Sequence, residues 1–534
     1  MSSGRTVPGK PFGAGEPAQL MRTFCGVSEV THRGSRHDQH MGDRHLDVTE
    51  QLPAGRGNAL AHGANPGAER RHHRLGRAEV LVAVLAFAAL CVAVLVRSVQ
   101  LLEPDDYAYR ASIIALTQGH LLSLTNVQYQ ELLKALSGGG GMGIAQWVHT
   151  TSGTWISEKN PGYPFLAAPF QALGILRAAP LFYGALGCLG LFAGARRWLG
   201  AWGGTWAVVL FCSSGAALAF AWRATMPTFT DASLIAAGAG ALLWAMLATE
   251  RTVRRRIVTG LLGFVALEAA VLVRYTNVVI LAVAVLAVIL LCRRAALPVR
   301  AALWWLGSVA VLIASVLGYD YLAYGSMLKT GYSSGEITFS LASVIPNLQH
   351  MPARLVTSMP MMVLALVALG WMAVRAVGSR RRDNAPEPRA RYRRDMVVGA
   401  VLAAGWIGIW GLYAAYDWTV RMGSAAGSDI HLIRFYLPAL GLITLLAAWL
   451  LVQLPRWLPV LLLVVLVGLG ARSYPNLVAG GLGGPGGGPA GSSGIGGPGG
   501  TGGPPPGSGG SGAVPGGPPA GVGGPGGAPA PGGP

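Results

Sequence analysis

Long apolar stretches are the feature that most constrains how this chain can fold. Only 12% of its 534 residues are charged, against roughly a quarter in soluble proteins. A helix needs about 20 mostly apolar residues to cross a membrane. The sequence therefore excludes a soluble globular protein and predicts an all-α integral membrane protein with about eleven transmembrane helices. The apolar stretches are 79–101, 176–195, 202–222, 229–249, 257–273, 277–292, 301–321, 358–377, 396–415, 435–453 and 457–471.

The distribution of charge orients these predicted spans. A net charge of +18 could indicate a nucleic-acid partner, but the basic residues gather in short loops. With the N-terminus in the cytoplasm, the even-numbered connections hold 18 basic residues and four acids, and almost all other acids fall on the opposite side. An excess of Arg and Lys in short loops marks the cytoplasmic side of a membrane protein. We therefore expect no nucleic acid and predict a multi-pass plasma-membrane protein with a cytoplasmic N-terminus.

Both ends of the chain differ in composition from the apolar region. Residues 1–78 are polar and lack apolar periodicity, which predicts a disordered cytoplasmic tail. Residues 473–534 contain no charged residue and are rich in Gly and Pro, which predicts a disordered extracytoplasmic tail. The membrane domain is then 79–472, with its longest external loop at 103–175. Of the 41 basic residues only four are Lys, a bias that indicates a high-GC bacterium.

Two adjacent carboxylates open the long external loop. Asp105 and Asp106 follow the first predicted span directly. Acids beside a bilayer are costly unless they are solvated or functional. We interpret them as a catalytic pair, in which one carboxylate serves a reacting hydroxyl or a metal and the other holds the geometry. The alternative is that one of them caps an amphipathic helix predicted over residues 109–122.

Three cations are predicted to lie on the same side of the membrane. Lys159 lies in the run Glu158-Lys159-Asn160-Pro161-Gly162-Tyr163-Pro164, whose prolines impose an extended entry into the second span. Arg274 ends the fifth span and Arg434 begins the tenth. Arginine binds phosphate through two parallel hydrogen bonds and stays charged. We interpret the three as a phosphate site, the alternative being cations that anchor helix ends at the interface.

Weaker signals come from other polar residues on this side. Residues 138–143 are nearly all Gly, which predicts a flexible hinge. An intramembrane acid is a functional candidate by default, and Glu268 lies inside the fifth span, although an internal partner would explain it equally well. The residues that we expect to line a substrate cleft are Tyr107, His149, Tyr163, Arg223 and Glu268.

With these residues the sequence resembles the GT-C superfamily of polyprenyl-phosphate-dependent membrane glycosyltransferases, over about residues 80–470. The nearest members are the protein O-mannosyltransferases, the lipid A aminoarabinose transferases and bacterial family 39. The resemblance rests on the Asp105-Asp106 pair, the run around Lys159, and Arg434-Phe435-Tyr436-Leu437-Pro438. The chain departs from the eukaryotic members in lacking a His-Pro-Pro-like loop motif and a soluble sugar-binding domain after the last span, which leaves the acceptor open.

The resemblance implies a reaction and assigns roles. A hexosyl or pentosyl group would pass, with inversion, from a polyprenyl-phosphate donor to a glycan, lipid or protein acceptor at the extracytoplasmic face. Asp105 or Asp106 would be the general base. Lys159, Arg274 and Arg434 would neutralise the phosphate leaving group. Members of the superfamily vary in their use of metal, so the sequence leaves a divalent metal ion open.

Two other functions remain as alternatives. A multi-pass transporter or flippase would have internal repeats and charges at the membrane midplane, whereas here the polar residues concentrate in one external loop. A cell-envelope polymer ligase also acts on a lipid phosphate, but its main external loop would be expected late in the chain rather than first.

Overall fold

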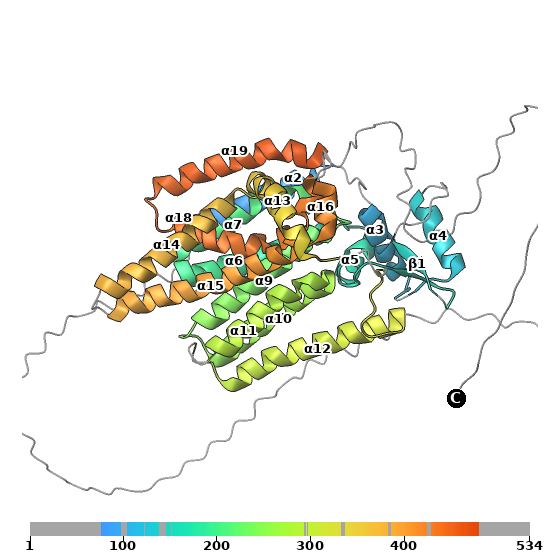
Figure 1. Cartoon of the computed structure of the whole chain (residues 1–534), viewed down its shortest axis with the longest axis horizontal. Coiled ribbons are helices and arrows are strands. Elements are labelled where there is room, and N and C mark those ends of the chain that lie inside the picture. The colour runs from blue at the N-terminus through green and yellow to red at the C-terminus, as the bar shows by residue number, and fades with distance from the viewer. Residues whose placement is uncertain are drawn as a thin grey trace, which may run out of the picture. The chain divides into compact units, whose positions relative to one another are not determined.

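The computed structural model describes residues 76–97, 104–121, 123–137, 146–150, 152–292, 295, 297–332, 337–382, 386–423 and 429–479. Almost all of the predicted N-terminal tail, most of the C-terminal tail and the glycine hinge at 138–143 lie outside these ranges. In the described part, helices form a bundle that continues at one end into a smaller group of helices and a hairpin (Figure 1).

The predicted all-α membrane fold is confirmed. Seven described helices are long and apolar enough to span a membrane, and an eighth span results if the pair α7 (Ala201–Cys212) and α8 (Gly215–Ala221), bent by 62°, counts as one. Three helices with shorter apolar stretches occupy the remaining predicted spans: α11 (Val278–Leu291), α18 (Leu440–Leu451) and α19 (Trp457–Ala479). The seven long helices are α2 (Arg77–Leu95), α6 (Ala178–Leu199), α9 (Thr228–Leu247), α10 (Val253–Val273), α12 (Val299–Tyr324), α14 (Met361–Arg382) and α15 (Pro386–Ala414).

Three details of the predicted spans differ from the structure. The stretch 202–222 is broken because Ser214 adopts an extended conformation and caps a new helix, its side chain accepting a hydrogen bond from the amide of Ala217 at 3.4 Å. The first span ends at Leu95 rather than near residue 101. Helix α19 continues to Ala479, into the segment that we predicted to be a tail.

Close packing of helices α6 and α9 forms the centre of the bundle. A Cβ atom added at Gly240 would lie 2.0 Å from the backbone oxygen of Gly190, and one added at Gly194 would lie 2.5 Å from the oxygen of Gly240. Small residues let helix backbones approach closely where lipid provides no hydrophobic driving force. Every residue of α18 is buried, as expected for a helix that is apolar on all sides.

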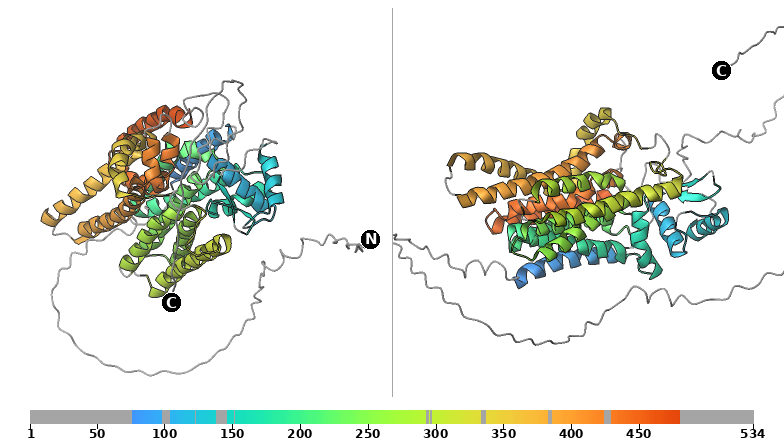
Figure 2. Two further views of the ribbon diagram at one scale, coloured as in Figure 1. Left: turned by 45° about the vertical axis from the view of Figure 1, so that its right-hand side comes forward. Right: turned by 90° about the horizontal axis from the view of Figure 1, so that it is seen from below.

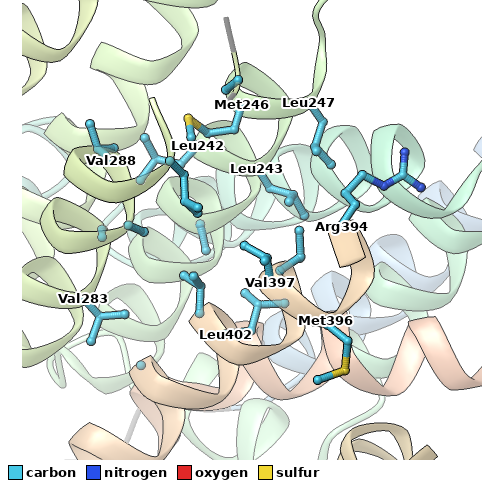
Figure 3. Close-up of a pocket in the computed structure, with 18 of the residues that line it drawn as sticks. Leu242, Leu243, Met246, Leu247, Val283, Val288, Arg394, Met396, Val397 and Leu402 are labelled. Atoms are coloured by element: carbon cyan, nitrogen blue, oxygen red, sulfur yellow. The ribbon is translucent and has the colours of Figure 1, made fainter. Parts of the chain in front are cut away.

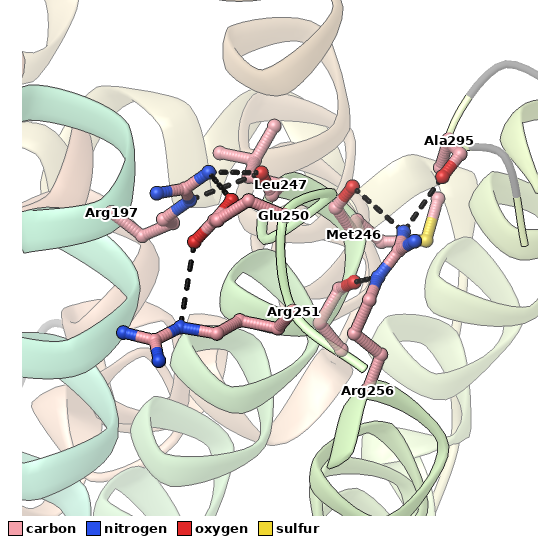
Figure 4. A network of polar contacts seen from close by, with 8 residues as sticks. Arg197, Met246, Leu247, Glu250, Arg251, Arg256 and Ala295 are labelled. Atoms are coloured by element: carbon pink, nitrogen blue, oxygen red, sulfur yellow. Dashed lines mark hydrogen bonds and ion pairs between the residues drawn. The ribbon is translucent and has the colours of Figure 1, made fainter. Parts of the chain in front are cut away.

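One end of the bundle collects arginine-rich connections that we predicted to face the cytoplasm (Figure 4). Arg197 pairs with Glu250, whose other oxygen lies 3.5 Å from Nε of Arg251. Arg256 donates to the backbone oxygens of Ala245 at 2.9 Å and Ala295 at 2.7 Å, which satisfies a carbonyl left over at the end of α9. Three separate connections thus lie at one end, as the charge pattern requires. The cytoplasmic assignment of that end stays a prediction.

The described parts of the loop 103–175, which we predicted to be external, form the opposite end and contain more helix and strand than the sequence indicated. Helix α3 (Pro104–Thr117) begins five residues before the predicted 109–122 helix, and α4 (Asn126–Ser137) and α5 (Gly162–Ala172) follow. Strands β1 (Trp147–His149) and β2 (Trp155–Ser157) pair antiparallel with Val148 opposite Ile156, a hairpin that the sequence did not predict. Short elements complete this end: η1 (Tyr275–Asn277), η2 (Leu341–Ser343), α13 (Val344–Ser358), α16 (Asp417–Gly423), α17 (Asp429–Ile433) and η3 (Leu437–Ala439).

Candidate active site

An ion cluster forms where the external loop meets the bundle. Asp105 lies in the first turn of α3, which favours acids because the helix dipole is positive there. Its Oδ1 lies 2.9 Å from Nζ of Lys159, in the connection between β2 and α5, and its Oδ2 lies 2.5 Å from Nη1 of Arg434, which follows α17. All three side chains are largely buried, with 14%, 7% and 11% of their surfaces exposed. Segments far apart in the sequence therefore supply one carboxylate and two cations to a single site.

The two cations control the protonation of Asp105. Burial alone would raise the pKa of its carboxyl, but the charges of Arg434 and Lys159 outweigh burial and hold that pKa well below its ordinary value. Burial by itself would lower the pKa of the Lys159 ammonium, but the charge of Asp105 raises it. The net effect is an increase of that pKa. The cluster is thus an ionised carboxylate between two permanent cations at neutral pH, with one positive charge in excess.

Arg274 contacts Arg434 and Asp231 rather than Asp105. Its Nη1 donates to the backbone oxygen of Arg434 at 2.9 Å, and its Nε lies 3.5 Å from Oδ2 of Asp231 in the first turn of α9. Asn277 donates to the other oxygen of Asp231 at 2.5 Å. The structure therefore places Arg274 beside Arg434, where its hydrogen bond positions the Arg434 backbone.

Aromatic residues that the sequence did not single out line the cations. Nζ of Lys159 donates to the hydroxyl of Tyr332 at 3.3 Å, and the guanidinium of Arg434 lies 5.3 Å from the ring centre of Trp418 and 4.8 Å from that of Phe435. The faces of aromatic rings attract cations and restrict their movement. Tyr332 follows α12 and Trp418 lies in the first turn of α16. Neither belongs to a sequence pattern that indicates a site, so only the tertiary structure identifies them.

Gln146 is a further member of the site that the sequence did not indicate. Its side chain lies near the Asp105 carboxylate and helps to lower the pKa of that carboxyl. Its backbone has a φ of +66°, in a region that residues other than Gly rarely adopt. The side-chain oxygen is buried and has no hydrogen-bond partner among the described residues. Such backbone strain persists only where the surroundings impose it and is frequent at functional sites.

Asp106 has a different environment from its neighbour. It is fully buried, pairs with Arg223 of the turn between α8 and α9, and accepts a hydrogen bond from Thr225 at 2.7 Å. Arg223 is equally inaccessible. We had predicted Asp106 to share the catalytic role and Arg223 to line a cleft; the structure places both in an internal ion pair that ties α3 to the bundle.

Breaking this internal pair should destabilise the protein. Asp106→Asn leaves the guanidinium of Arg223 buried without its counter-charge, which costs about 3–5 kcal/mol. We expect a clearly lower midpoint of thermal unfolding in detergent. Glu131→Gln on the exposed side of α4 removes the same charge from the same loop and should leave the midpoint within error. Equal midpoints for the two variants would contradict the structural role.

The remaining predicted cleft residues do not join the cluster. Tyr163 is fully buried and donates to the backbone oxygen of Ala224. Glu268 accepts a hydrogen bond from Ser308 of α12 at 2.7 Å, the internal partner that was its alternative explanation. Tyr107 is 41% exposed, and His149 packs edge-on against Trp155 at 5.1 Å on the exposed side of the hairpin. No described group of three or more His, Cys, Asp or Glu is arranged to hold a metal ion.

The chain is similar to solved structures of membrane glycosyltransferases. ArnT from Cupriavidus metallidurans is 14% identical, with a TM-score of 0.48, over 74% of this chain and 64% of that one. A second ArnT structure, bound to undecaprenyl phosphate, is 15% identical with a TM-score of 0.47. The Archaeoglobus fulgidus oligosaccharyltransferase is 11% identical with a TM-score of 0.43, over 76% of this chain and 56% of that one.

The similarity to these structures is one of fold alone. The chain spans less than two thirds of the length of each. Neither a protein-family model nor a curated protein matches the sequence.

Proposed function

We propose that this protein transfers a sugar from a polyprenyl-phosphate donor to an acceptor hydroxyl at the extracytoplasmic face of the membrane. The observation that carries the proposal is the convergence of Asp105, Lys159 and Arg434 in one largely buried cluster. Two cations at the end of the helix bundle could bind the phosphate of a lipid-linked sugar. The carboxylate between them could accept the proton of the acceptor hydroxyl.

Charge balance explains how a donor would enter the cluster. Lys159 and Arg434 carry two positive charges against the single negative charge of Asp105. A donor phosphate would compete with Asp105 for these cations and release one carboxylate oxygen from its ion pair. The planar guanidinium of Arg434 has its donors in a fixed arrangement that matches a phosphate. The hydrogen bond from Arg274 to the Arg434 backbone would hold that guanidinium in position.

The reaction then follows as a direct displacement. The acceptor oxygen attacks the anomeric carbon and forms the new C–O bond, while the bond from that carbon to the phosphate oxygen breaks. The proton of the acceptor hydroxyl passes to the released oxygen of Asp105. The electron pair of the broken bond stays on the polyprenyl phosphate, whose added charge Lys159 and Arg434 neutralise. Such a displacement inverts the anomeric centre.

Release of polyprenyl phosphate tests the proposal without knowledge of the acceptor. The full chain in proteoliposomes would be supplied with undecaprenyl-phosphate sugars and an envelope extract, and free undecaprenyl phosphate would be measured by mass spectrometry. We expect extract-dependent release that Asp105→Asn strongly reduces. Movement of the intact sugar lipid between leaflets without cleavage would support the flippase alternative instead.

The side chain of Gln146 is expected to orient a reactant. Its unpartnered oxygen lies in the cluster and can accept a hydrogen bond from a hydroxyl of the sugar or acceptor. Gln146→Gly removes the amide but tolerates the positive φ, so the backbone should keep its path. Loss of one hydrogen bond of about 1–1.5 kcal/mol predicts a roughly tenfold lower kcat/KM. An unchanged kcat/KM in this variant would exclude the role.

A further inference from the structure

A large cavity lies in the bundle away from the Asp105 cluster. It has a volume of about 1380 Å³ and is enclosed mainly by α9, α11 and α15 (Figure 3). Its walls are apolar, with Leu242, Leu243, Val288 and Leu402 among the lining residues. Sites for drug-sized ligands measure about 300–1,000 Å³, so this cavity is suited to a larger apolar occupant.

Cations lie at one edge of the cavity. Tyr392, Arg393 and Arg394, near the start of α15, belong to its lining, and Arg394 lies at the edge of the apolar walls in Figure 3. Both arginine side chains are exposed, and Nε of Arg394 lies 3.5 Å from Oδ1 of the adjacent Asp395. Ala295, whose backbone oxygen accepts from Arg256, also lines the cavity. The cavity therefore opens at the arginine-rich end of the bundle.

The position along α15 gives the depth of the cavity in the membrane. From Arg394 to Tyr413, whose ring lies 5.0 Å from that of Phe435 beside the active-site cluster, the helix rises about 30 Å. That rise equals the thickness of the hydrocarbon layer, about 30 Å, so Arg394 lies at the headgroup level of the leaflet opposite the cluster. From Arg394 to Gly405, the last α15 residue of the lining, the rise is about 16 Å, close to the depth of one leaflet.

We propose that this cavity binds one anionic phospholipid of the leaflet at the arginine-rich end. Its acyl chains lie between α9, α11 and α15, and its phosphate lies on Arg393 and Arg394. The charge of the two arginines selects a phospholipid over an uncharged occupant, because arginine and phosphate form strong paired hydrogen bonds. The depth of one leaflet selects a lipid over a transmembrane helix, which would need the full thickness. This site is separate from the proposed donor site and does not depend on the proposed function.

Native mass spectrometry of the full chain in detergent, titrated with phosphatidylglycerol or phosphatidylcholine, tests the proposal. We expect one tightly retained phosphatidylglycerol and weaker retention of phosphatidylcholine. Arg393→Ala with Arg394→Ala should weaken phosphatidylglycerol binding at least tenfold, because it deletes both charged donors that would bind the phosphate. Arg254→Ala with Arg255→Ala, which removes two exposed arginines of the same end outside the cavity lining, is the matched control and should bind like the wild type.

A second variant separates the cavity from the charges. Ala239→Phe with Ala284→Phe fills the lining from two walls and keeps both arginines. We expect loss of the retained phosphatidylglycerol while the protein elutes as a single folded species. Equal binding in the Arg393/Arg394 variant and its control would overturn the proposal. So would unchanged retention in the filled variant, or a second chain rather than a lipid in the wild-type complex.

Discussion

Asp105→Asn is expected to lower the rate of sugar transfer by about 10²–10⁴-fold, the contribution typical of a positioned general base. The variant keeps the size and hydrogen-bonding atoms of the side chain but cannot accept the proton of the acceptor hydroxyl. Because Asn no longer competes for Lys159 and Arg434, donor binding should be retained or become tighter. Single-turnover transfer and donor affinity, measured on the same preparation, check both parts.

Two comparisons make this result specific. Asp106→Asn alters the adjacent residue in the same way and should lower thermal stability while each folded molecule keeps most of its transfer rate. The depressed pKa of Asp105 keeps its carboxylate ionised, so the rate of the wild type should show no titration of this group between about pH 5 and 8. Wild-type transfer by Asp105→Asn, or a loss of donor affinity in that variant, would rule out the base role.

Removing either cation should instead weaken donor binding. Lys159→Ala and Arg434→Ala each delete a charged contact to phosphate, and such contacts contribute about 1.5–3 kcal/mol. We expect about a 10- to 100-fold higher Kd for undecaprenyl phosphate in each variant. Binding to the purified protein in nanodiscs, followed by displacement of a labelled lipid, measures this directly.

Matched variants guard against a general charge effect. Lys134→Ala removes an exposed Lys from α4 in the same loop and should bind the lipid like the wild type. Arg434→Lys keeps the charge but loses the paired donors, so its Kd should fall between those of the wild type and Arg434→Ala. Unchanged affinity in both Lys159→Ala and Arg434→Ala would place the phosphate elsewhere.

The sequence indicates which charged residues could take part in a site, but not which residues they contact. Asp105, Lys159 and Arg434 stand out because charges are scarce near the predicted spans, and the structure brings all three together. Gln146 and Tyr332 lie in connections with no periodic or compositional signal. A contact between residues hundreds of positions apart leaves no trace in a local pattern.

The two adjacent acids show the limit most clearly. The sequence predicts them as one pair, whereas the structure includes them in the first turn of α3. Successive residues of a helix point about 100° apart. Asp105 therefore faces Lys159 and Arg434, while Asp106 faces Arg223 and Thr225 in the interior.

The sequence alone determined that this chain crosses a membrane with many helices and which ends of those helices carry the arginines. Transfer of apolar side chains into lipid and the exclusion of charge from it depend on local composition, which a sequence displays directly. Only the tertiary structure decided which acid meets which cation, where α7 and α8 break, and that α9, α11 and α15 enclose a cavity. These features depend on side-chain packing between distant segments, which the amino-acid pattern of any one segment does not contain.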